Sequence, residues 1–165
     1  MKYSVGVEYA LHCLLYMVDL PAGQAVGIKD LALYQGVSET YLSKVFTRLR
    51  KAGLIQAAPG VKGGYRLLAK PEEITFWGVV EAIEGAEPLF QCQEIRQREL
   101  LLDQEHLPDA YTKCPCLINT VMQEGENQLR QYLNSKTLAW LHQQGATKIP
   151  QEHKRAMENW FAGKR

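Results

Sequence analysis

Glycine and proline interrupt the first 70 residues so closely that only short helices fit between them, and this spacing constrains the fold more than any other feature. Apolar residues recur with helical spacing in three runs, which end near Pro21, Gly36 and Gly53. Ser38 is a good N-cap for the third run, whose apolar stripe consists of Leu42, Val45, Phe46 and Leu49. Three short helices are therefore predicted before residue 54.

Two short strands are predicted directly after these helices. Residues 54–58 are apolar, residues 59–64 are a turn-forming cluster rich in glycine, and residues 65–68 return as a second strand. Three helices followed by a two-stranded hairpin are typical of a winged helix-turn-helix domain. The predicted fold class is mainly α with a small β-hairpin.

The second half of the chain has a different pattern. Another helix is predicted to end at Gly85, and the periodicity is lost over residues 89–116, a polar segment. It returns from Leu117 as a long helix, whose apolar stripe includes Ile118, Val121, Met122, Gly125, Leu129, Tyr132 and Leu133. A short helical unit is predicted over 135–141, and one or two amphipathic turns in the tail from Gly145.

Charge is distributed unevenly along the chain, although the net charge is only +1. Residues 1–70 hold nine Lys and Arg against four acids, whereas residues 71–165 hold ten against fourteen. A basic front half favours a polyanionic partner for that half. A solvated surface without such a partner is the alternative on charge alone.

The third predicted helix and the hairpin carry the residues expected to contact DNA. A recognition helix presents polar side chains to the major groove, and a glycine-rich wing approaches phosphates or the minor groove. The predicted DNA-binding residues are Ser38, Thr40, Tyr41, Lys44, Arg48, Lys62, Gly63, Gly64 and Arg66. The alternative is a winged-helix protein–protein interaction module that regulates a partner protein without binding DNA. Salt dependence distinguishes the two, because counterion release weakens DNA binding steeply as salt rises.

Several ordered motifs resemble the IscR/NsrR/CymR family of bacterial winged-helix transcription regulators. The matching runs begin at Tyr9, Ile28, Gly36, Leu49, Gly63, Lys70 and Val80. The resemblance covers residues 1–87 and resumes weakly over 116–141. It implies a homodimer that binds a nearly palindromic operator. It further implies that the residues matching Ser38, Thr40 and Tyr41 read the major groove, and that the long C-terminal helix crosses to the second subunit. Pro59 departs from the pattern, since many members carry an arginine there, before the wing glycine.

The four cysteines divide into two kinds. Cys13 lies within the apolar run of the first helix, where a buried, inert thiol is expected. Cys92, Cys114 and Cys116 lie in the polar segment, where packing does not call for thiols. In a reducing compartment such a group favours metal binding or redox chemistry over a structural disulfide. A zinc site or no ligand at all is a further alternative.

The resemblance implies a sensor at these three cysteines, because cluster-binding members of the family carry three in the same segment. Cys92 and Cys116 match the first and last, whereas 21 residues separate Cys92 from Cys114 in place of an even spacing. One model is a 2Fe–2S cluster on Cys92, Cys114 and Cys116, with Glu8 from the second subunit as a fourth ligand. An exposed acid without a ligand role is the alternative for Glu8. The other model is a thiol switch without a cofactor. In either model the protein, expected to be a repressor, senses redox, iron–sulfur or nitrosative and oxidative state. His106 is a further candidate ligand, with a solvated loop histidine as the alternative.

The sequence is thus predicted to have four parts: a DNA-binding domain at 1–87, a cysteine-containing sensor loop at 88–116, a dimerisation helix region at 117–145 and a tail with a short amphipathic helix at 146–165. An enzyme is not expected, because no phosphate-binding glycine motif or nucleophile elbow occurs and the four histidines are scattered. Neither a membrane span nor a signal peptide is expected, so the predicted location is the cytoplasm.

Overall fold

The computed structural model describes residues 2–21, 24–60 and 63–162. Within it the chain forms two units, each with its own internal contacts. The winged-helix unit comprises Lys2–Ala86 and Leu133–Arg165, and the cysteine unit comprises Glu87–Tyr132. The two units are described separately.

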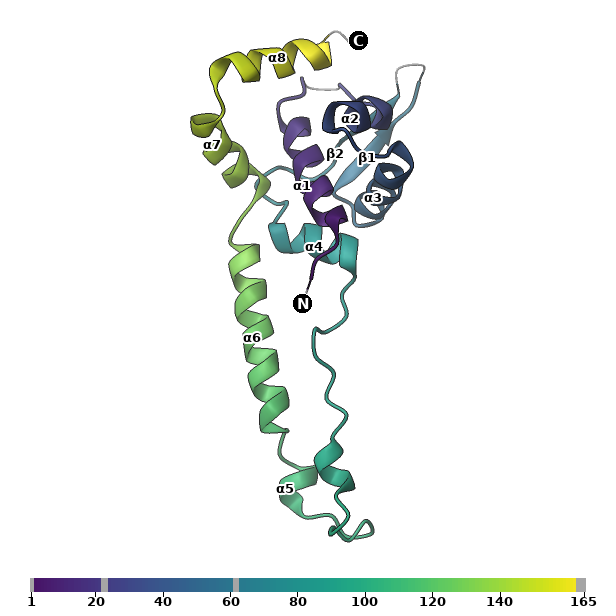
Figure 1. Ribbon diagram of the computed structural model, residues 1–165, viewed down its shortest axis with the longest axis vertical. Helices are drawn as coiled ribbons and strands as arrows, with labels where there is room; N and C mark the ends of the chain where they lie inside the picture. Colours follow the sequence, from purple (N-terminus) through teal and green to yellow (C-terminus); the bar gives the residue numbers. More distant parts are fainter. Residues whose placement is uncertain (1, 22–23, 61–62, 163–165) are drawn as a thin grey trace. The chain divides into compact units, whose positions relative to one another are not determined.

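The winged-helix unit begins with three short helices and a hairpin, as predicted (Figure 1). Its elements are α1 (Val5–Val18), α2 (Ile28–Gln35), α3 (Glu39–Lys51), β1 (Ile55–Ala58), β2 (Gly64–Leu67) and α4 (Phe76–Glu84). The Ser38 hydroxyl accepts the Tyr41 amide at 3.3 Å and caps α3. Gly36 ends α2 with φ of 67°, a left-handed conformation that favours glycine. The predicted fold class is confirmed.

The core of this unit lies between α1, α3 and α4. Side chains from the predicted stripes are fully buried, among them Leu14, Leu42, Phe46, Leu49 and Val79. Each large apolar side chain removed from water in this way stabilises the fold by about 1.5–3 kcal/mol. The opposite face of α3 is therefore left for solvent or a ligand.

The hairpin is antiparallel, with Ile55 opposite Leu67 and Ala58 opposite Gly64. Val26 extends it through two backbone hydrogen bonds to Tyr65, at 3.0 and 2.9 Å. This bridge brings the backbones so close that a Cβ at Gly64 would lie 2.4 Å from the Val26 carbonyl oxygen. Only glycine fits there, so the backbone itself fixes the base of the wing.

The C-terminal part of the winged-helix unit is more regular than the sequence predicted. α7 spans Leu138–Lys148 and passes through Gly145, where we had expected the tail to begin. Its N-terminus is fixed by the Leu138 amide, which donates to the Ile74 carbonyl at 2.8 Å. α8 spans Gln151–Ala162, twelve residues in place of one or two turns.

Aromatic side chains attach α8 to the first two helices. The Phe161 ring lies 5.1 Å from Tyr34 and 6.0 Å from Tyr16, centre to centre. Tyr16 and Tyr34 in turn meet edge to face at 5.0 Å. These separations are within the range in which aromatic pairs attract each other.

The cysteine unit contains a short 3-10 helix η1 (Ile95–Arg98), a single turn α5 (Asp109–Thr112) and most of the long helix α6 (Leu117–Asn134). Glu126 is the one buried charged side chain among the described residues, 8% exposed. Its carboxylate accepts the Leu89 amide at 2.9 Å and the Arg130 guanidinium at 2.9 and 2.6 Å. These bonds fasten the segment at Leu89 to α6.

In the described part of the chain, none of the helices combines the length and apolar character needed to cross a bilayer.

Candidate DNA-binding surface and cysteine site

The N-terminal end of α3 exposes the polar residues predicted to read bases. Ser38, Thr40 and Lys44 are exposed, since the apolar stripe of the same helix faces the core. Tyr41 is 36% exposed, and its ring packs edge to face on Tyr9 at 5.7 Å between centres. One side of this tyrosine is therefore held by α1, while the rest of it is accessible.

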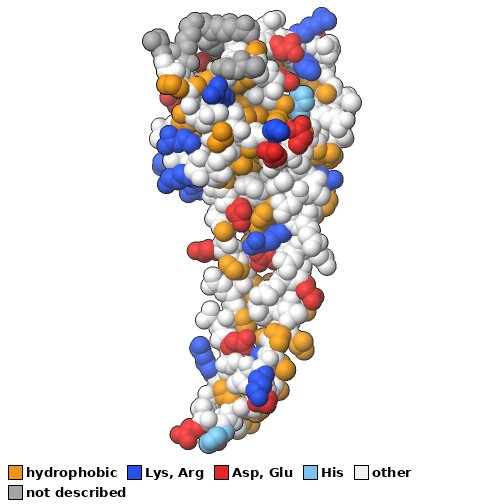
Figure 2. Space-filling view, turned by 180° about the vertical axis from the view of Figure 1, so that it is seen from behind, with side chains coloured by type: hydrophobic (Ala, Val, Ile, Leu, Met, Phe, Trp, Pro, Cys, Tyr) orange, Lys and Arg blue, Asp and Glu red, His pale blue; other side chains and the backbone are white. Residues whose placement is uncertain are grey.

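Four exposed cations follow along α3: Lys44, Arg48, Arg50 and Lys51. Figure 2 shows Lys and Arg side chains gathered on one side of the winged-helix unit, at the left of the view. The Arg48 guanidinium donates to the Ile83 carbonyl and so joins α3 to the end of α4. This structural role was not foreseen, and a phosphate contact by Arg48 stays a prediction.

In the wing, Arg66 is exposed on β2 opposite Gln56. Lys62 lies outside the described residues. Gly63 and Gly64 both have steric reasons to be glycine, because a Cβ at Gly63 would lie 2.8 Å from the Ala58 carbonyl oxygen. The two glycines therefore shape the wing, and a contact between them and DNA stays a prediction.

The four cysteines are free thiols. Cys13 is fully buried, and desolvation raises its pKa to about 12, as expected of an inert core thiol.

Cys92 and Cys116 are electrostatic neighbours, because each of the two thiols shifts the pKa of the other. Cys116 directly precedes α6, and the Asn119 amide, more than the Ile118 amide and the other neighbours, lowers its pKa against the effect of burial. The Glu94 amide lowers the pKa of Cys92, but burial and the neighbouring Cys116 outweigh it and raise that pKa. Of the two thiols, Cys116 has the lower pKa and therefore forms a thiolate more readily.

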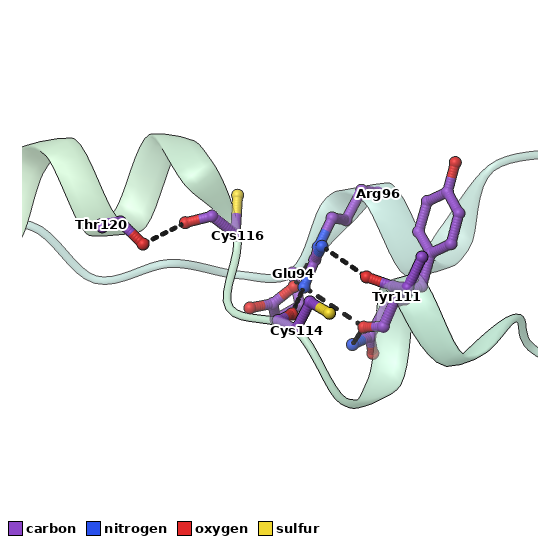
Figure 3. A network of polar contacts seen from close by, with 8 residues as sticks. Glu94, Arg96, Tyr111, Cys114, Cys116 and Thr120 are labelled. Carbon is purple, nitrogen blue, oxygen red and sulfur yellow. Dashed lines mark hydrogen bonds and ion pairs between the residues drawn. The ribbon is translucent and has the colours of Figure 1, made fainter.

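An arginine network joins Glu94 to the segment that precedes Cys116 (Figure 3). The Arg96 guanidinium pairs with the Glu94 carboxylate at 2.8 Å and donates to backbone carbonyls of the segment that precedes Cys116. Sequence reasoning did not single out Arg96. No periodic pattern identifies it, because the backbone carbonyls that it binds lie 14 to 18 residues away.

The third cysteine does not complete a metal site. Figure 3 shows the sulfurs of Cys114 and Cys116 pointing in different directions. Among the described residues, no three His, Cys, Asp or Glu side chains are grouped so that they would hold a metal ion. His106 is 81% exposed in its side chain and pairs with Asp103 at 3.1 Å. The donors as arranged here therefore do not fit an iron–sulfur cluster.

Glu8, predicted as a fourth ligand from a second subunit, is exposed on α1 of the winged-helix unit. Cys92, Cys114 and Cys116 belong to the other unit. A role for Glu8 as a ligand stays a prediction.

Three short helices, an antiparallel wing and a cationic recognition face define a winged-helix transcription regulator. The chain belongs to the family described as Rrf2, iron-dependent transcriptional regulator, whose model matches residues 3–144. Members of this family are regulators and not enzymes, and the resemblance seen in the sequence is confirmed.

The chain is 35% identical over 139 residues to protein rrf2 of Nitratidesulfovibrio vulgaris, which covers 84% of this chain and 85% of that protein. It is also 35% identical over 102 residues to the transcriptional regulator NsrR of Geobacillus kaustophilus, covering 62% of this chain and 69% of the relative. Among solved structures, IscR of T. potens matches with a TM-score of 0.65 and 22% identity, over 92% of this chain and 93% of that one. The family match ends before α8.

Proposed function

We propose that this regulator is a homodimeric repressor that binds a nearly palindromic operator and senses oxidants through Cys92 and Cys116. The observation that carries the proposal is the bonding of Arg96 to Glu94, two residues after Cys92, and to the Cys114 carbonyl, two residues before Cys116. In addition, each of these two thiols shifts the pKa of the other. Such a regulator would act in the cytoplasm, where its thiols are kept reduced.

The proposed DNA contacts are made by the N-terminal end of α3 and by the wing. Ser38, Thr40 and Tyr41 would face base edges in the major groove, while Lys44 and Arg66 would pair with phosphates. The exposure of these side chains supports the assignment. Gel-shift titration against a candidate operator at several salt concentrations tests it, because removing one phosphate contact reduces the salt slope by about one.

Lys44→Ala is the test variant, and Lys148→Ala is its control. Lys148 is an exposed lysine on α7 of the same unit, so its loss removes the same charge from another element. We expect Lys44→Ala alone to weaken binding and reduce the slope. Equal effects in the two variants would contradict a specific role for α3.

The proposed dimer contact is the apolar stripe of α6. Leu117, Ile118 and Val121 are 80%, 66% and 65% exposed, so this chain alone leaves the stripe uncovered. A groove of about 600 Å³, lined mostly by apolar side chains of α1, α4 and α7, is a suitable acceptor for the helix of the second copy. Together these surfaces support an isologous pair, in which each copy gives and receives α6.

Sedimentation velocity tests the dimer. Ile118→Asp places a charge in the stripe and is expected to give monomers, whereas Asn127→Asp places the same charge at an exposed position on the opposite side of α6 and is expected to leave dimers. A dimer of unchanged stability in Ile118→Asp would refute this interface.

The sensing step is a two-electron oxidation by a peroxide. The Cys116 thiolate attacks one peroxide oxygen and becomes a sulfenic acid, and the other oxygen leaves as hydroxide. The Cys92 thiol then attacks the oxidised sulfur and releases water, so that the two thiols and one hydrogen peroxide give one disulfide and two waters. The disulfide changes DNA affinity only if it stabilises one conformation of the dimer, either the one that binds DNA or the one that does not, more than the other.

The experiment that tests the sensor is purification without oxygen, followed by iron and sulfide assays and mass spectrometry after one equivalent of hydrogen peroxide. We expect a colourless protein without iron, and a Cys92–Cys116 disulfide with reduced operator binding. A brown protein that contains iron and acid-labile sulfide would contradict the thiol switch and support the model with a 2Fe–2S cluster on Cys92, Cys114 and Cys116.

A further inference from the structure

Arg96 occupies an unusual place in the cysteine unit. It lies on η1, and its side chain is only 23% exposed although neither η1 nor α5 contains a buried residue. Its Nε donates to the Glu94 carboxylate at 2.8 Å and its Nη1 to the Ala110 carbonyl at 3.1 Å. Its Nη2 donates to the carbonyls of Tyr111, at 3.2 Å, and Cys114.

These partners belong to the two flanks of the cysteine loop. Glu94 follows Cys92 by two residues, and the Cys114 carbonyl precedes Cys116 by two residues. One side chain therefore ties together the two segments that carry the paired thiols (Figure 3). Among the described residues of the loop, the side-chain amide of Gln97 also joins the two flanks, through one bond to the Tyr111 carbonyl at 2.7 Å.

The backbone beside Arg96 is held in a costly conformation. Glu94 has φ of 47°, the one positive value among the described residues other than glycine. Such a conformation persists where surrounding contacts determine it. Glu94 is bonded to Arg96 and lies two residues after Cys92, so the strained residue connects the arginine to the first cysteine along the chain.

We propose that Arg96 is the positioning residue of the thiol switch: by binding Glu94 and three carbonyls of residues 110–114, it holds Cys116 against Cys92. The inference rests on the proposed thiol switch and adds the residue that assembles it. The planar fork of the guanidinium is needed, because it donates in several fixed directions at once, which a lysine ammonium on a flexible stem does not reproduce.

The test compares Arg96→Gln with Arg98→Gln. Arg98 is exposed on the same 3-10 helix, so its replacement removes the same charge two residues away. Two readouts report on thiol positioning: the rate of Cys92–Cys116 disulfide formation with hydrogen peroxide, and the equilibrium between dithiol and disulfide in a glutathione buffer. We expect both to fall about tenfold in Arg96→Gln, the size of effect that one lost charge-assisted hydrogen bond produces. Arg98→Gln is expected to match the wild type.

Two further variants keep the result interpretable. Glu94→Gln leaves Arg96 in place but removes its ion pair, and it is expected to slow disulfide formation in the same direction by a smaller factor. Arg96→Lys keeps the charge without the fork and is expected to behave like Arg96→Gln. A wild-type rate in Arg96→Lys would show that charge alone matters and would overturn the positioning role.

The failure of this inference is distinguishable from the failure of the proposed switch. If peroxide produces no Cys92–Cys116 disulfide in the wild type, the thiol switch itself is wrong. If the wild type forms the disulfide and Arg96→Gln forms it at the same rate, the switch stands and the positioning role is refuted. Operator binding by the reduced Arg96→Gln protein is expected to equal that of the wild type, because Arg96 is outside the winged-helix unit.

Discussion

Replacing Glu126 with Gln is expected to release the segment at Leu89 from α6. The Glu126 carboxylate is buried and accepts three hydrogen bonds, one from the Leu89 amide and two from Arg130. A hydrogen bond to a charged group contributes about 1.5–3 kcal/mol. Gln keeps one acceptor oxygen. The Arg130 side chain is 30% exposed, so water can replace the hydrogen bonds that it loses. The net loss of stabilising free energy is therefore close to that of one such bond.

Hydrogen exchange at the Leu89 amide, followed by NMR, measures this loss directly. An opening free energy lower by about 1.5–3 kcal/mol makes the amide exchange roughly ten- to a hundredfold faster. Glu124→Gln is the control, since Glu124 is exposed on the same helix. The Val79 amide of α4 serves as an internal reference. Equal Leu89 exchange in the two variants would show that the carboxylate does not hold the segment.

The same clamp predicts a dependence on pH. The Arg130 hydrogen bonds, followed by the Leu89 amide, hold the pKa of Glu126 below its ordinary 4.5, against the effect of burial. A lowered pKa means that the stabilisation is complete above pH 4.5 and is lost as the pH falls through the folded-state value. Corrected for intrinsic rates, Leu89 exchange is expected to accelerate below pH 4.5 in the wild type and not in Glu126→Gln. An identical profile in both would refute the assignment to Glu126.

Three further substitutions test the winged-helix unit by urea unfolding followed by tryptophan fluorescence. Ser38→Ala removes the cap that accepts the Tyr41 amide and is expected to cost about 1 kcal/mol of unfolding free energy; no change would mean that solvent replaces the cap. Gly64→Ala places a Cβ against the Val26 carbonyl and is expected to cost about 1–3 kcal/mol. Gly145→Ala on α7 of the same unit is the control, because the nearest atom to its Cβ would be Ile149 Cδ1 at an ordinary 3.7 Å. Phe161→Ala removes the ring between Tyr16 and Tyr34 and is expected to cost about 1–3 kcal/mol, less than a fully buried Phe because the ring is partly exposed; an unaltered midpoint would show that α8 does not stabilise this unit.

The first 85 residues were predictable because their local signals agree with their packing. Gly36, Ser38 and Gly53 each end or begin a helix through their own backbone or side chain, without help from distant residues. Gly145 was misjudged because glycine is only a weak breaker. The α7 helix continues through it, since tertiary hydrogen bonds near its start, such as Leu138 to Ile74, outweigh the local preference.

The membership of the cysteine site stays a prediction, and its pairing could not be predicted from the sequence. The sequence presents Cys92, Cys114 and Cys116 as three equivalent polar-segment thiols, and their spacing alone does not indicate which two meet. The pairing that we propose depends on contacts of Arg96 with residues far along the chain, which follow no helical or strand period. Glu126 and Arg130, by contrast, have the four-residue spacing of a helical ion pair, so this half of the clamp was visible in the sequence.

The free energy needed to close the long spacer between Cys92 and Cys114 can be compared with the free energy that the Arg96 hydrogen bonds supply. Loop closure costs only about 0.6 kcal/mol for each doubling of length, so a spacer of 21 residues costs roughly 1.2 kcal/mol more than one a quarter as long. A single charge-assisted hydrogen bond of about 1.5–3 kcal/mol offsets that difference. The tip of the loop is then free to vary, as the 96% exposure of both Leu100 and Leu101 indicates. Replacing residues 100–104 by a Gly-Ser segment of equal length should therefore leave the rate of Cys92–Cys116 disulfide formation within about twofold of the wild type. A loss as large as that expected for Arg96→Gln would mean that the tip, and not the arginine network, brings the thiols together.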